Sequence, residues 1–432
     1  MKLTINQLFH TNKTLSKALW ITSTGDLLGL FAFAVLLTKI NNNPLYAGLV
    51  LPVYGFAAAL SSLVFPSLLN RIDNKKLLIF SQLTLGLSAV LVAFLWTSSV
   101  FTNNIIVISF FFFESFLSQL FTFARETYSK RLEETTDLVS GKSKIRLKLQ
   151  SQIETGYLAG VFGGPLLFLV LTEFYKIPPF LIIALNAVSF FIAAFMCLRL
   201  PNIKYSIEPM SIFKPLKYIN KNHRLLFVFV FRVFFLFVSL SLFSTLMFPL
   251  ISENFKLNIN YSSIVYSIIA AGALIGIKLT NHSNFSRIPF LRSNNELSEI
   301  NIAITGNYIY AIAVAIFAST SSLAIGAIAC VFAGIANGLQ KVSTRSIMRS
   351  ESSSSHYAEI ISLEFLLSNF LDLIVTALFF ALTTYGVTSQ DAIYFAGFWL
   401  VAFTPFFLMI RDEKKEIILV PGKITVSVKS AS

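Results

Sequence analysis

The sequence predicts an all-α membrane protein whose twelve transmembrane helices form two six-helix pseudo-repeats. Two observations lead to this prediction. Of the 432 residues, 55% are hydrophobic and 13% are charged, with a mean hydropathy of +0.72, whereas a soluble domain carries about 25% charged residues. The hydrophobic residues also form runs that are long enough to cross about 30 Å of hydrocarbon as helices. A surface with so few charges must face lipid, which excludes a soluble enzyme.

The predicted spans are separated by short polar connections. The first six cover residues 18–38, 45–69, 77–98, 104–124, 153–173 and 178–199. The next six cover residues 225–250, 261–281, 300–320, 322–343, 360–384 and 391–410. The first run contains an A-x-A pattern. However, Asp26 lies within this run and apolar residues continue past the pattern, so we expect a helix and not a cleaved signal peptide.

The positions of the basic residues predict the orientation of the helices. If the N-terminus is cytoplasmic, 30 of the 34 lysines and arginines fall in cytoplasmic segments, and the outer loops hold Lys39, Lys176 and Lys256. The positive-inside rule then predicts an inner-membrane protein with both termini in the cytoplasm. The net charge of +13 is explained by topology, because the basic residues form no contiguous face that would bind nucleic acid. We expect a monomer in the bilayer.

A polar stretch in the middle of the chain divides the spans into two sets of six. We expect an N-terminal bundle over residues 1–200, a cytoplasmic linker over 201–224, a C-terminal bundle over 225–411 and a cytoplasmic tail over 412–432. Each bundle carries a basic connection after its second span, which is typical of internal repeats. The charged connection 125–152 is predicted to be a solvated loop with a short surface helix.

The connection between the second and third spans resembles a family signature. Residues 67–78 read S-L-L-N-R-I-D-N-K-K-L-L, and the corresponding loop of the major facilitator superfamily reads G-x-x-x-D-R-x-G-R-[RK]. Arg71 and Lys75 fit this pattern, while Asn70 replaces the usual Asp and Asp73 replaces the usual Gly. An acid at the later position is familiar in the branch of macrolide and enterobactin exporters. Residues 23–26 of the first span, S-T-G-D, resemble the opening of that branch.

This resemblance implies the major facilitator fold and a role in transport. In that family the first, fourth, seventh and tenth spans line a central cavity, and the loop at Asn70, Arg71, Asp73 and Lys75 gates its cytoplasmic side. The fifth span is similar to the glycine-proline motif of antiporters. The residues concerned are Gly160, Gly163, Gly164 and Pro165. Close helix packing is the default interpretation of such glycines, and a gating role is the alternative.

Charged and polar residues inside the spans indicate where a site lies, because a charge at mid-membrane costs roughly 2.5–3.5 kcal/mol. Asp26 lies about 12 Å into the first span, and Arg232 lies about 10 Å into the seventh. Glu114 lies near the middle of the fourth. The candidate residues of a proton and substrate cavity are Asp26, Glu114, Arg232, Asn337, Asn369 and Asp372.

Glu114 is predicted to be the principal proton site. Ser118 and Thr122 continue its helix face, and its own span has no basic residue nearby. Burial disfavours the ionised form of a carboxyl group, so a buried acid can gain and lose a proton. Asp26 and Asp372 are secondary candidates, and Arg232 is predicted to respond to the state of Glu114. The sequence also allows a structural ion pair between Asp26 and Arg232.

Two further acids have simpler interpretations. Glu364 lies about one turn from the end of its span, where it could reach the membrane interface. Glu154 lies at the predicted start of the fifth span, where an acid favours the helix N-terminus.

The sequence thus predicts a proton-coupled secondary transporter, which exports an amphipathic small molecule such as a siderophore or a drug. Uptake, metal export and a transport-dead sensor are alternatives. The sequence holds no G-x-x-x-x-G-K-[ST] motif for ATP and no catalytic set in its spans, so we expect neither an enzyme nor a cofactor. We expect no metal site, because Cys197 and Cys330 lack partners at ligand spacing and the histidines lie in connections.

Overall fold

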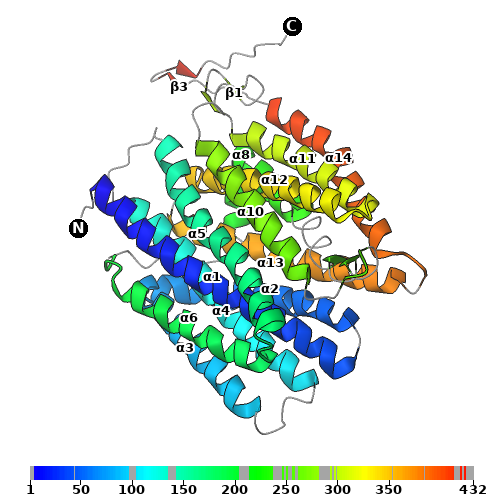
Figure 1. Cartoon of the computed structure of the whole chain (residues 1–432). Coiled ribbons are helices and arrows are strands. Elements are labelled where there is room, and N and C mark those ends of the chain that lie inside the picture. Colours follow the sequence, from blue (N-terminus) through cyan, green and yellow to red (C-terminus); the bar gives the residue numbers. More distant parts are fainter. Residues whose placement is uncertain are drawn as a thin grey trace.

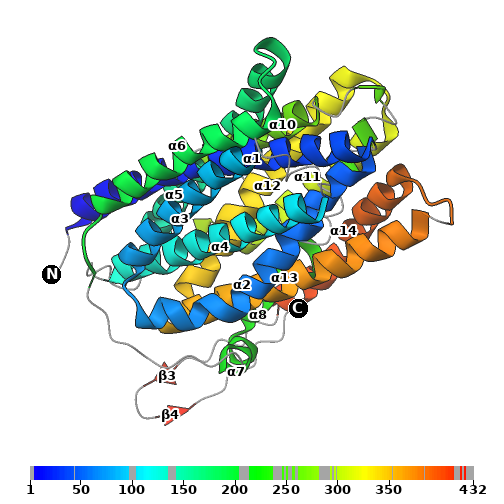
Figure 2. The same cartoon turned by 90° about the horizontal axis from the view of Figure 1, so that it is seen from below.

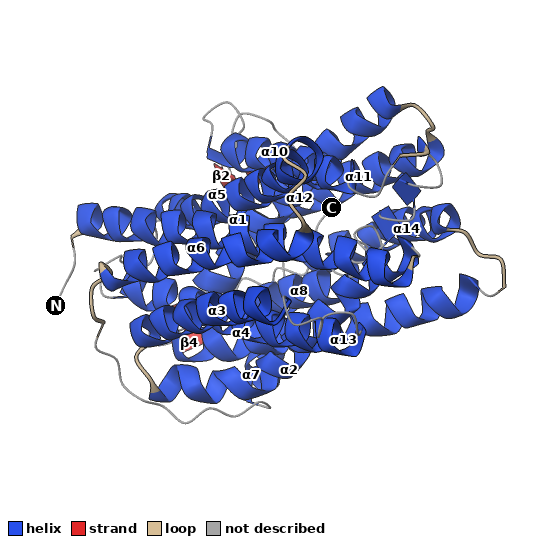
Figure 3. Cartoon of the chain, turned by 60° about the horizontal axis from the view of Figure 1, so that its bottom comes forward, coloured by secondary structure: helices blue, strands red, loops and turns tan. Residues whose placement is uncertain are grey.

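The structure is a computed structural model, and almost everything that it describes is helical (Figure 3). The described residues are 4–42, 44–96, 104–134, 143–203, 214–236, 246–247, 250–251, 255–257, 261–281, 292–293, 296–297, 299–352, 354–383, 385–412, 419–420 and 423–424. Two pairs of two-residue strands complete the structure. They are β1 (Arg292–Ser293) with β2 (Glu296–Leu297), and β3 (Leu419–Val420) with β4 (Lys423–Ile424).

The first group of helices lies between residues 5 and 198. It comprises α1 (Ile5–Asn41), the 3₁₀ turn η1 (Pro44–Leu49), α2 (Val50–Arg71), α3 (Asn74–Trp96), α4 (Asn104–Glu134), α5 (Ser143–Leu169), the π-helical turn η3 (Val170–Phe174) and α6 (Pro179–Leu198). We call α1 to α6 the N-terminal helices.

The second group begins after residue 213. It comprises α7 (Lys214–Lys221), α8 (His223–Val230), the π-helical turn η4 (Phe231–Leu236), α10 (Ser262–Asn281), α11 (Glu299–Ser319), α12 (Leu323–Ser350), α13 (Ser354–Thr383) and α14 (Ser389–Asp412). We call α8 to α14 the C-terminal helices.

Ten helices of the described chain are long and apolar enough to cross a membrane, so the protein is a multi-pass membrane protein. They correspond to the predicted spans one to six and eight to eleven. The predicted seventh span, 225–250, is described as α8 and η4 up to residue 236, and beyond that only residues 246–247 and 250 of it are described. The predicted twelfth span corresponds to α14. The prediction of twelve spans therefore stays a prediction.

Several helices extend beyond their predicted spans, which corrects the prediction of a solvated loop at 125–152. Helix α4 continues to Glu134 and α5 begins at Ser143, so both ends of that connection are helical. The side chains of residues 125–133 are buried in spite of their many charges. Helix α12 likewise continues past residue 343 to Ser350, and α1 begins at Ile5 with a capping box at Thr4. The added turns carry charged residues that find partners inside the protein.

The N-terminal and C-terminal helices lie side by side, and two helix pairs make their most extensive contacts (Figures 1 and 2). Helix α2 packs against α13, and α5 packs against α10. Within the first group α1 contacts α5 and α6, and within the second α12 contacts α10 and α11.

One end of the bundle brings α1, α4 and α12 together. Ser129 of α4 donates to Asn12 near the start of α1 (3.5 Å), and Arg349 near the end of α12 donates to Ser129 (3.3 Å). We call this the basic end, because it carries the buried arginines described below.

Helices α1 and α5 approach so closely that glycine is required at their contact. A Cβ atom at Gly160 would lie 2.5 Å from Cβ of Ser23, and one at Gly164 would lie 2.5 Å from the carbonyl oxygen of Thr24. Gly163 has more room, because its nearest neighbour, Oγ1 of Thr24, would be 3.9 Å away. These contacts favour helix packing as the role of the α5 glycines.

Helix α5 contains the proline of the glycine-proline motif. Pro165 lies inside the helix, where it cannot donate a backbone hydrogen bond. Helix α5 ends at Leu169, and the chain continues as the π-helical turn η3.

The contact between α10 and α12 is made in the same way. Gly272 and Gly276 of α10 face Gly334 and Gly338 of α12, and a Cβ atom at any of the four would overlap a backbone carbonyl oxygen of the other helix. The two backbones are therefore in direct contact over more than one turn.

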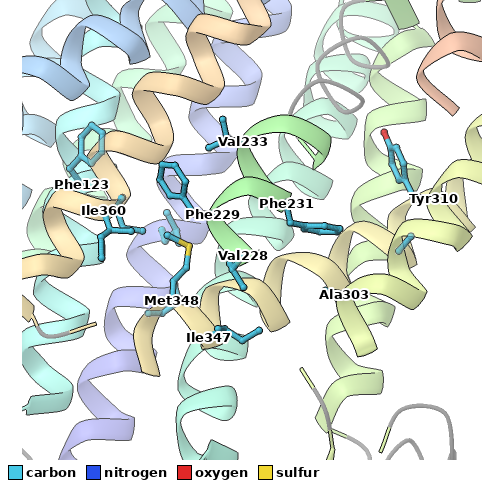
Figure 4. Close-up of a cluster of buried hydrophobic side chains, with 14 of the residues drawn as sticks. Phe123, Val228, Phe229, Phe231, Val233, Ala303, Tyr310, Ile347, Met348 and Ile360 are labelled. Carbon is cyan, nitrogen blue, oxygen red and sulfur yellow. The ribbon is translucent and has the colours of Figure 1, made fainter. Parts of the chain in front are cut away.

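An apolar cluster joins the two groups of helices near the basic end (Figure 4). Phe123 of α4, Phe229 of α8, Met348 of α12 and Ile360 of α13 gather there, and all four are buried. The ring of Phe123 also meets the ring of Phe365 edge to face, with centroids 5.3 Å apart. Van der Waals contacts of this kind drive helix association in lipid.

Candidate functional site

A cavity of about 220 Å³ lies among the N-terminal helices, between α1 and α4. Leucine, phenylalanine, valine and glycine residues form its apolar lining. Its polar lining residues are Ser23, Asp26, Tyr54, Glu114, Ser115, Ser118, Thr122, Tyr157, Asn186 and Tyr266. Of the described residues that line it, only Tyr266 comes from the C-terminal helices.

The cavity brings together Glu114, the predicted principal proton site, and Asp26, one of the two secondary candidates. Asp26 of α1 accepts a hydrogen bond from Ser118 of α4 at 3.2 Å. Glu114 precedes Ser118 by one turn, is 8% exposed, and accepts from Ser88 of α3 at 3.5 Å. Asp26 thus has a hydroxyl donor of its own, whereas the Ser88 hydroxyl also donates to the carbonyl oxygen of Leu85 at 2.9 Å, so Glu114 is the less strongly bonded acid.

Small residues of α1 place Asp26 at the cavity. A Cβ atom at Gly25 would overlap the side chain of Asn186 of α6, and one at Gly29 would lie 3.1 Å from the same side chain. Helix α6 can therefore pack directly on α1 on either side of Asp26. The acid is held at the cavity wall by this packing and by Ser118.

Polar atoms of α4 are left available at the cavity wall. Ser115 is 3% exposed, and its Oγ has no hydrogen-bond partner among the described residues. Gln119, one turn further, donates to the hydroxyl of Tyr54 at 2.6 Å, while its Oε1 has no described partner. Because a buried polar group without a partner is costly, the Oγ of Ser115 suits a hydrogen bond to a bound molecule, whereas Gln119 is not a lining residue.

No lysine, arginine or histidine is among the described residues that line the cavity. Asp26 and Glu114 therefore share an apolar, hydroxyl-lined space without a neutralising base in its wall. Such a space can hold a proton on either acid, or a positively charged group between them.

Arg232 lies elsewhere, among the C-terminal helices. Its guanidinium forms a short ion pair with Glu364 of α13 and donates to Thr344 of α12 at 2.7 Å. Arg345 of α12 binds the other oxygen of Glu364 at 2.8 Å. All three charged residues are at most 4% exposed.

This cluster corrects two interpretations of the sequence. Glu364 does not reach the membrane interface but is fully buried between two arginines. Arg232 pairs with Glu364 in this structure and not with Asp26, which accepts a hydrogen bond from Ser118. A coupling role for Arg232 stays a prediction.

Charged residues of α12 also bind the N-terminal helices near the basic end. Lys341 forms an ion pair with Glu154 of α5 at 3.0 Å. Arg349 binds Glu126 at 3.1 Å and Glu133 at 2.6 Å, both on α4. Glu154 is therefore not a residue of a helix N-terminus, since α5 begins eleven residues earlier at Ser143. These pairs link the two groups of helices.

Sequence reasoning missed this interhelical network, although a signal was present. Lys341, Arg345 and Arg349 follow one another at four-residue steps and so occupy one face of a helix. Ending the predicted span at residue 343 assigned the last two to a polar connection.

The other predicted cavity residues lie outside the cavity wall. Asn369 of α13 donates to the carbonyl oxygen of Phe365 at 2.6 Å, and Asp372 accepts from Thr376 at 3.4 Å. A Cβ atom at Gly55 of α2 would lie 3.2 Å from Asp372, so this acid is at the α2–α13 contact. Asn337 of α12 is half-buried and is not a lining residue.

The predicted gating loop joins α2 to α3. Arg71 is the last residue of α2, and its exposed position leaves its predicted gating role untested. Asp73 accepts a hydrogen bond from the backbone N–H of Lys75 at 2.8 Å, which caps the start of α3. An acid in place of the usual glycine thus has a local structural role. The side chain of Asn70 lies outside the described residues.

The fold and the cavity define a polytopic membrane protein with a buried acidic site. The profile of the Major Facilitator Superfamily matches residues 18–371, which is most of the chain. The protein belongs to the Major Facilitator Superfamily, a family of membrane transporters. This confirms the family that the residues at 67–78 indicated.

Solved structures of transporters share the fold at low sequence identity. A bacterial homologue of the iron transporter ferroportin, in an outward-facing state, is 13% identical, with a TM-score of 0.66 over 93% of this chain and 100% of that chain. The human organic anion transporter MFSD10 is 12% identical, with a TM-score of 0.64 over 92% and 99%. The nucleoside transporter NupG is 15% identical, with a TM-score of 0.60 over 93% and 99%. No curated protein sequence matches the chain.

Proposed function

We propose that the protein is a secondary active transporter of the inner membrane, which couples proton movement to the export of an amphipathic small molecule. The observation that carries this proposal is the cavity that holds Asp26 and Glu114 without a base in its described wall. The resemblance of the first span and the gating loop to the branch of macrolide and enterobactin exporters supports export as the direction of transport.

The two acids supply a physical basis for coupling. Two negative charges in one apolar space repel each other, so a proton on either acid removes an unfavourable buried charge. Ser118 donates to the ionised form of Asp26, and the Ser88 hydroxyl lies 3.5 Å from Glu114, so each acid has a hydroxyl group beside it when it releases its proton to water or to an arriving ligand. A cavity that alternates between the two sides of the membrane would then carry protons in one direction and substrate in the other.

The ion pairs at the basic end support alternating access. The positive-inside rule assigns this end to the cytoplasm, together with both termini. Arg349 with Glu126, and Lys341 with Glu154, hold the C-terminal helices to the N-terminal helices there. We propose that transport requires these pairs to separate, with residues 1–200 and 225–411 moving as two bundles in a monomer.

The proposal is tested by reconstituting the purified chain in liposomes and imposing a pH gradient. Candidate amphipathic compounds should accumulate only with the gradient, and Glu114→Gln should abolish accumulation while leaving downhill exchange largely intact. Glu173→Gln is the matched control, because Glu173 lies outside the cavity and pairs with the exposed Lys176. Accumulation by Glu114→Gln at the normal rate would exclude Glu114 as the proton site and make Asp26 the first alternative.

A further inference from the structure

We propose that the cavity selects a compact organic cation, with its charged nitrogen between Asp26 and Glu114 and its apolar part against the aromatic wall. This inference rests on the proposed transport function and names its substrate class.

The charge of the cavity points to a cation. Asp26 and Glu114 are its two acidic lining residues, and no basic side chain is among the described residues that line it. An anion would bring a third negative charge into a space whose described lining holds no basic side chain. A cation would neutralise the carboxylates and would need no base from the protein.

The remaining lining suits a carbon skeleton. The aromatic lining residues are Tyr54, Phe111, Phe121, Tyr157, Phe190 and Tyr266. Aromatic rings attract cations through their negative faces, and ammonium groups bind such cages well. One of these rings already does so in this structure, because the ammonium group of Lys341 lies 3.8 Å from the ring centroid of Tyr157. The volume of about 220 Å³ lies below the usual range of drug-sized sites, so the cation should be small.

The same features disfavour a metal ion as the cargo. Hard metal ions require six or more oxygen ligands in a regular arrangement. The described residues contain no group of three or more His, Cys, Asp or Glu side chains that could hold a metal ion. Most of the cavity wall consists of carbon atoms that cannot act as ligands.

Tyr266 is the residue through which the C-terminal helices contribute to selectivity. It lies on α10, and its ring meets Phe31 of α1 edge to face with centroids 5.3 Å apart. Its ring therefore sits at the cavity on an apolar support. We expect Tyr266→Phe to retain cation binding, because the aromatic face is kept, and Tyr266→Leu to weaken it.

The test measures binding of radiolabelled phenyltrimethylammonium to the purified full chain by equilibrium dialysis, without any gradient. The competitors are the unlabelled cation, tert-butylbenzene, which has the same shape without charge, benzenesulfonate, which has the opposite charge, and Mn²⁺. Only the unlabelled cation should compete. Asp26→Asn and Glu114→Gln should each weaken binding about tenfold, since each removes one of two opposing charges. Glu173→Gln should bind as the wild type does.

Three results would overturn the inference. They are the absence of saturable binding at millimolar concentration, equal competition by tert-butylbenzene or benzenesulfonate, and displacement by Mn²⁺, which would indicate a metal site. If an acidic variant does not fold, the Tyr266→Leu and Tyr266→Phe pair still provides the test. Because binding is measured at equilibrium, cation binding without gradient-driven transport would reject the proposed function alone. Transport of an uncharged compound would reject the cation alone.

Discussion

Buried acids are held in two different ways in this protein. Glu364 is fully buried between Arg232 and Arg345, so its negative charge is neutralised on both carboxylate oxygens. Asp26 and Glu114 lie in a cavity, where serine hydroxyl groups lie within hydrogen-bond distance of their carboxylates. The difference shows that a charge within a membrane helix does not by itself indicate a functional site. The partner decides whether the charge holds helices together or is available for chemistry.

The largest effect on stability is expected for Glu364→Gln. The substitution removes the carboxylate charge that neutralises the buried guanidinium groups of Arg232 and Arg345. Breaking a buried ion pair in this way costs about 3–5 kcal/mol. The free energy of unfolding in mixed micelles measures the loss. Adding Arg232→Gln removes one stranded charge and should recover part of it. A loss below about 1 kcal/mol would mean that water solvates these arginines and that the two regions do not differ as described.

A smaller effect, on conformation, is expected for Arg349→Gln. This variant removes the pairs with Glu126 and Glu133 and should let the basic end open more often. In a background without Cys197 and Cys330, the rate of thiol labelling at Thr127→Cys should rise about tenfold, which corresponds to roughly 1.4 kcal/mol. Arg199→Gln is the control, because Arg199 lies at the end of α6 over the ring of Phe195.

If labelling in Arg349→Gln matches the parent protein, the ion pairs do not hold the basic end closed. The apolar cluster around Phe123 would then be the part that does so.

A still smaller loss is expected for Arg224→Gln. Arg224 pairs with Glu351 at 3.0 Å and with Glu299 at 3.6 Å, but its side chain is half exposed. Exposed pairs contribute at most about 1 kcal/mol. The same unfolding titration should therefore separate this variant clearly from Glu364→Gln. A loss as large as that of Glu364→Gln would show that exposure is a poor guide to the strength of pairs in this protein.

The smallest effect on stability is expected for Asp26→Asn. The amide oxygen can still accept the hydrogen bond from Ser118, and no buried base loses a partner. The change in unfolding free energy should be within about 0.5 kcal/mol. A loss of several kcal/mol would show that Asp26 has a structural role like that of Glu364, and would remove it from the cavity chemistry.

Much of the fold could be predicted from the sequence, because the length of apolar runs and the position of basic residues follow directly from the bilayer. The limits of the helices could not. The charges at 125–133 and 341–349 are typical of solvated connections, yet they continue α4 and α12. Arg349, for example, pairs with Glu126 and Glu133, which lie more than 200 residues away in the chain. Periodicity along a helix is visible in a sequence, whereas the partner across it is not.

The candidate site was predicted in part for the same reason. Glu114 and Asp26 were found from their depth and from the hydroxyl groups that continue the face of Glu114. Which of the acids Asp26, Glu114 and Glu364 pairs with Arg232 depends on how α13 packs against η4. The periodicity of apolar residues in the sequence does not determine this packing. The cavity itself depends on the glycines of α1, which let α6 approach.

The glycine contact between α10 and α12 joins these two helices into a single rigid unit. With backbone against backbone, neither helix can slide or tilt far without carrying the other along. Helix α10 places Tyr266 at the cavity, and helix α12 places Lys341 and Arg349 near the basic end. A rigid movement of this helix pair would therefore shift the tyrosine ring and the ion pairs together.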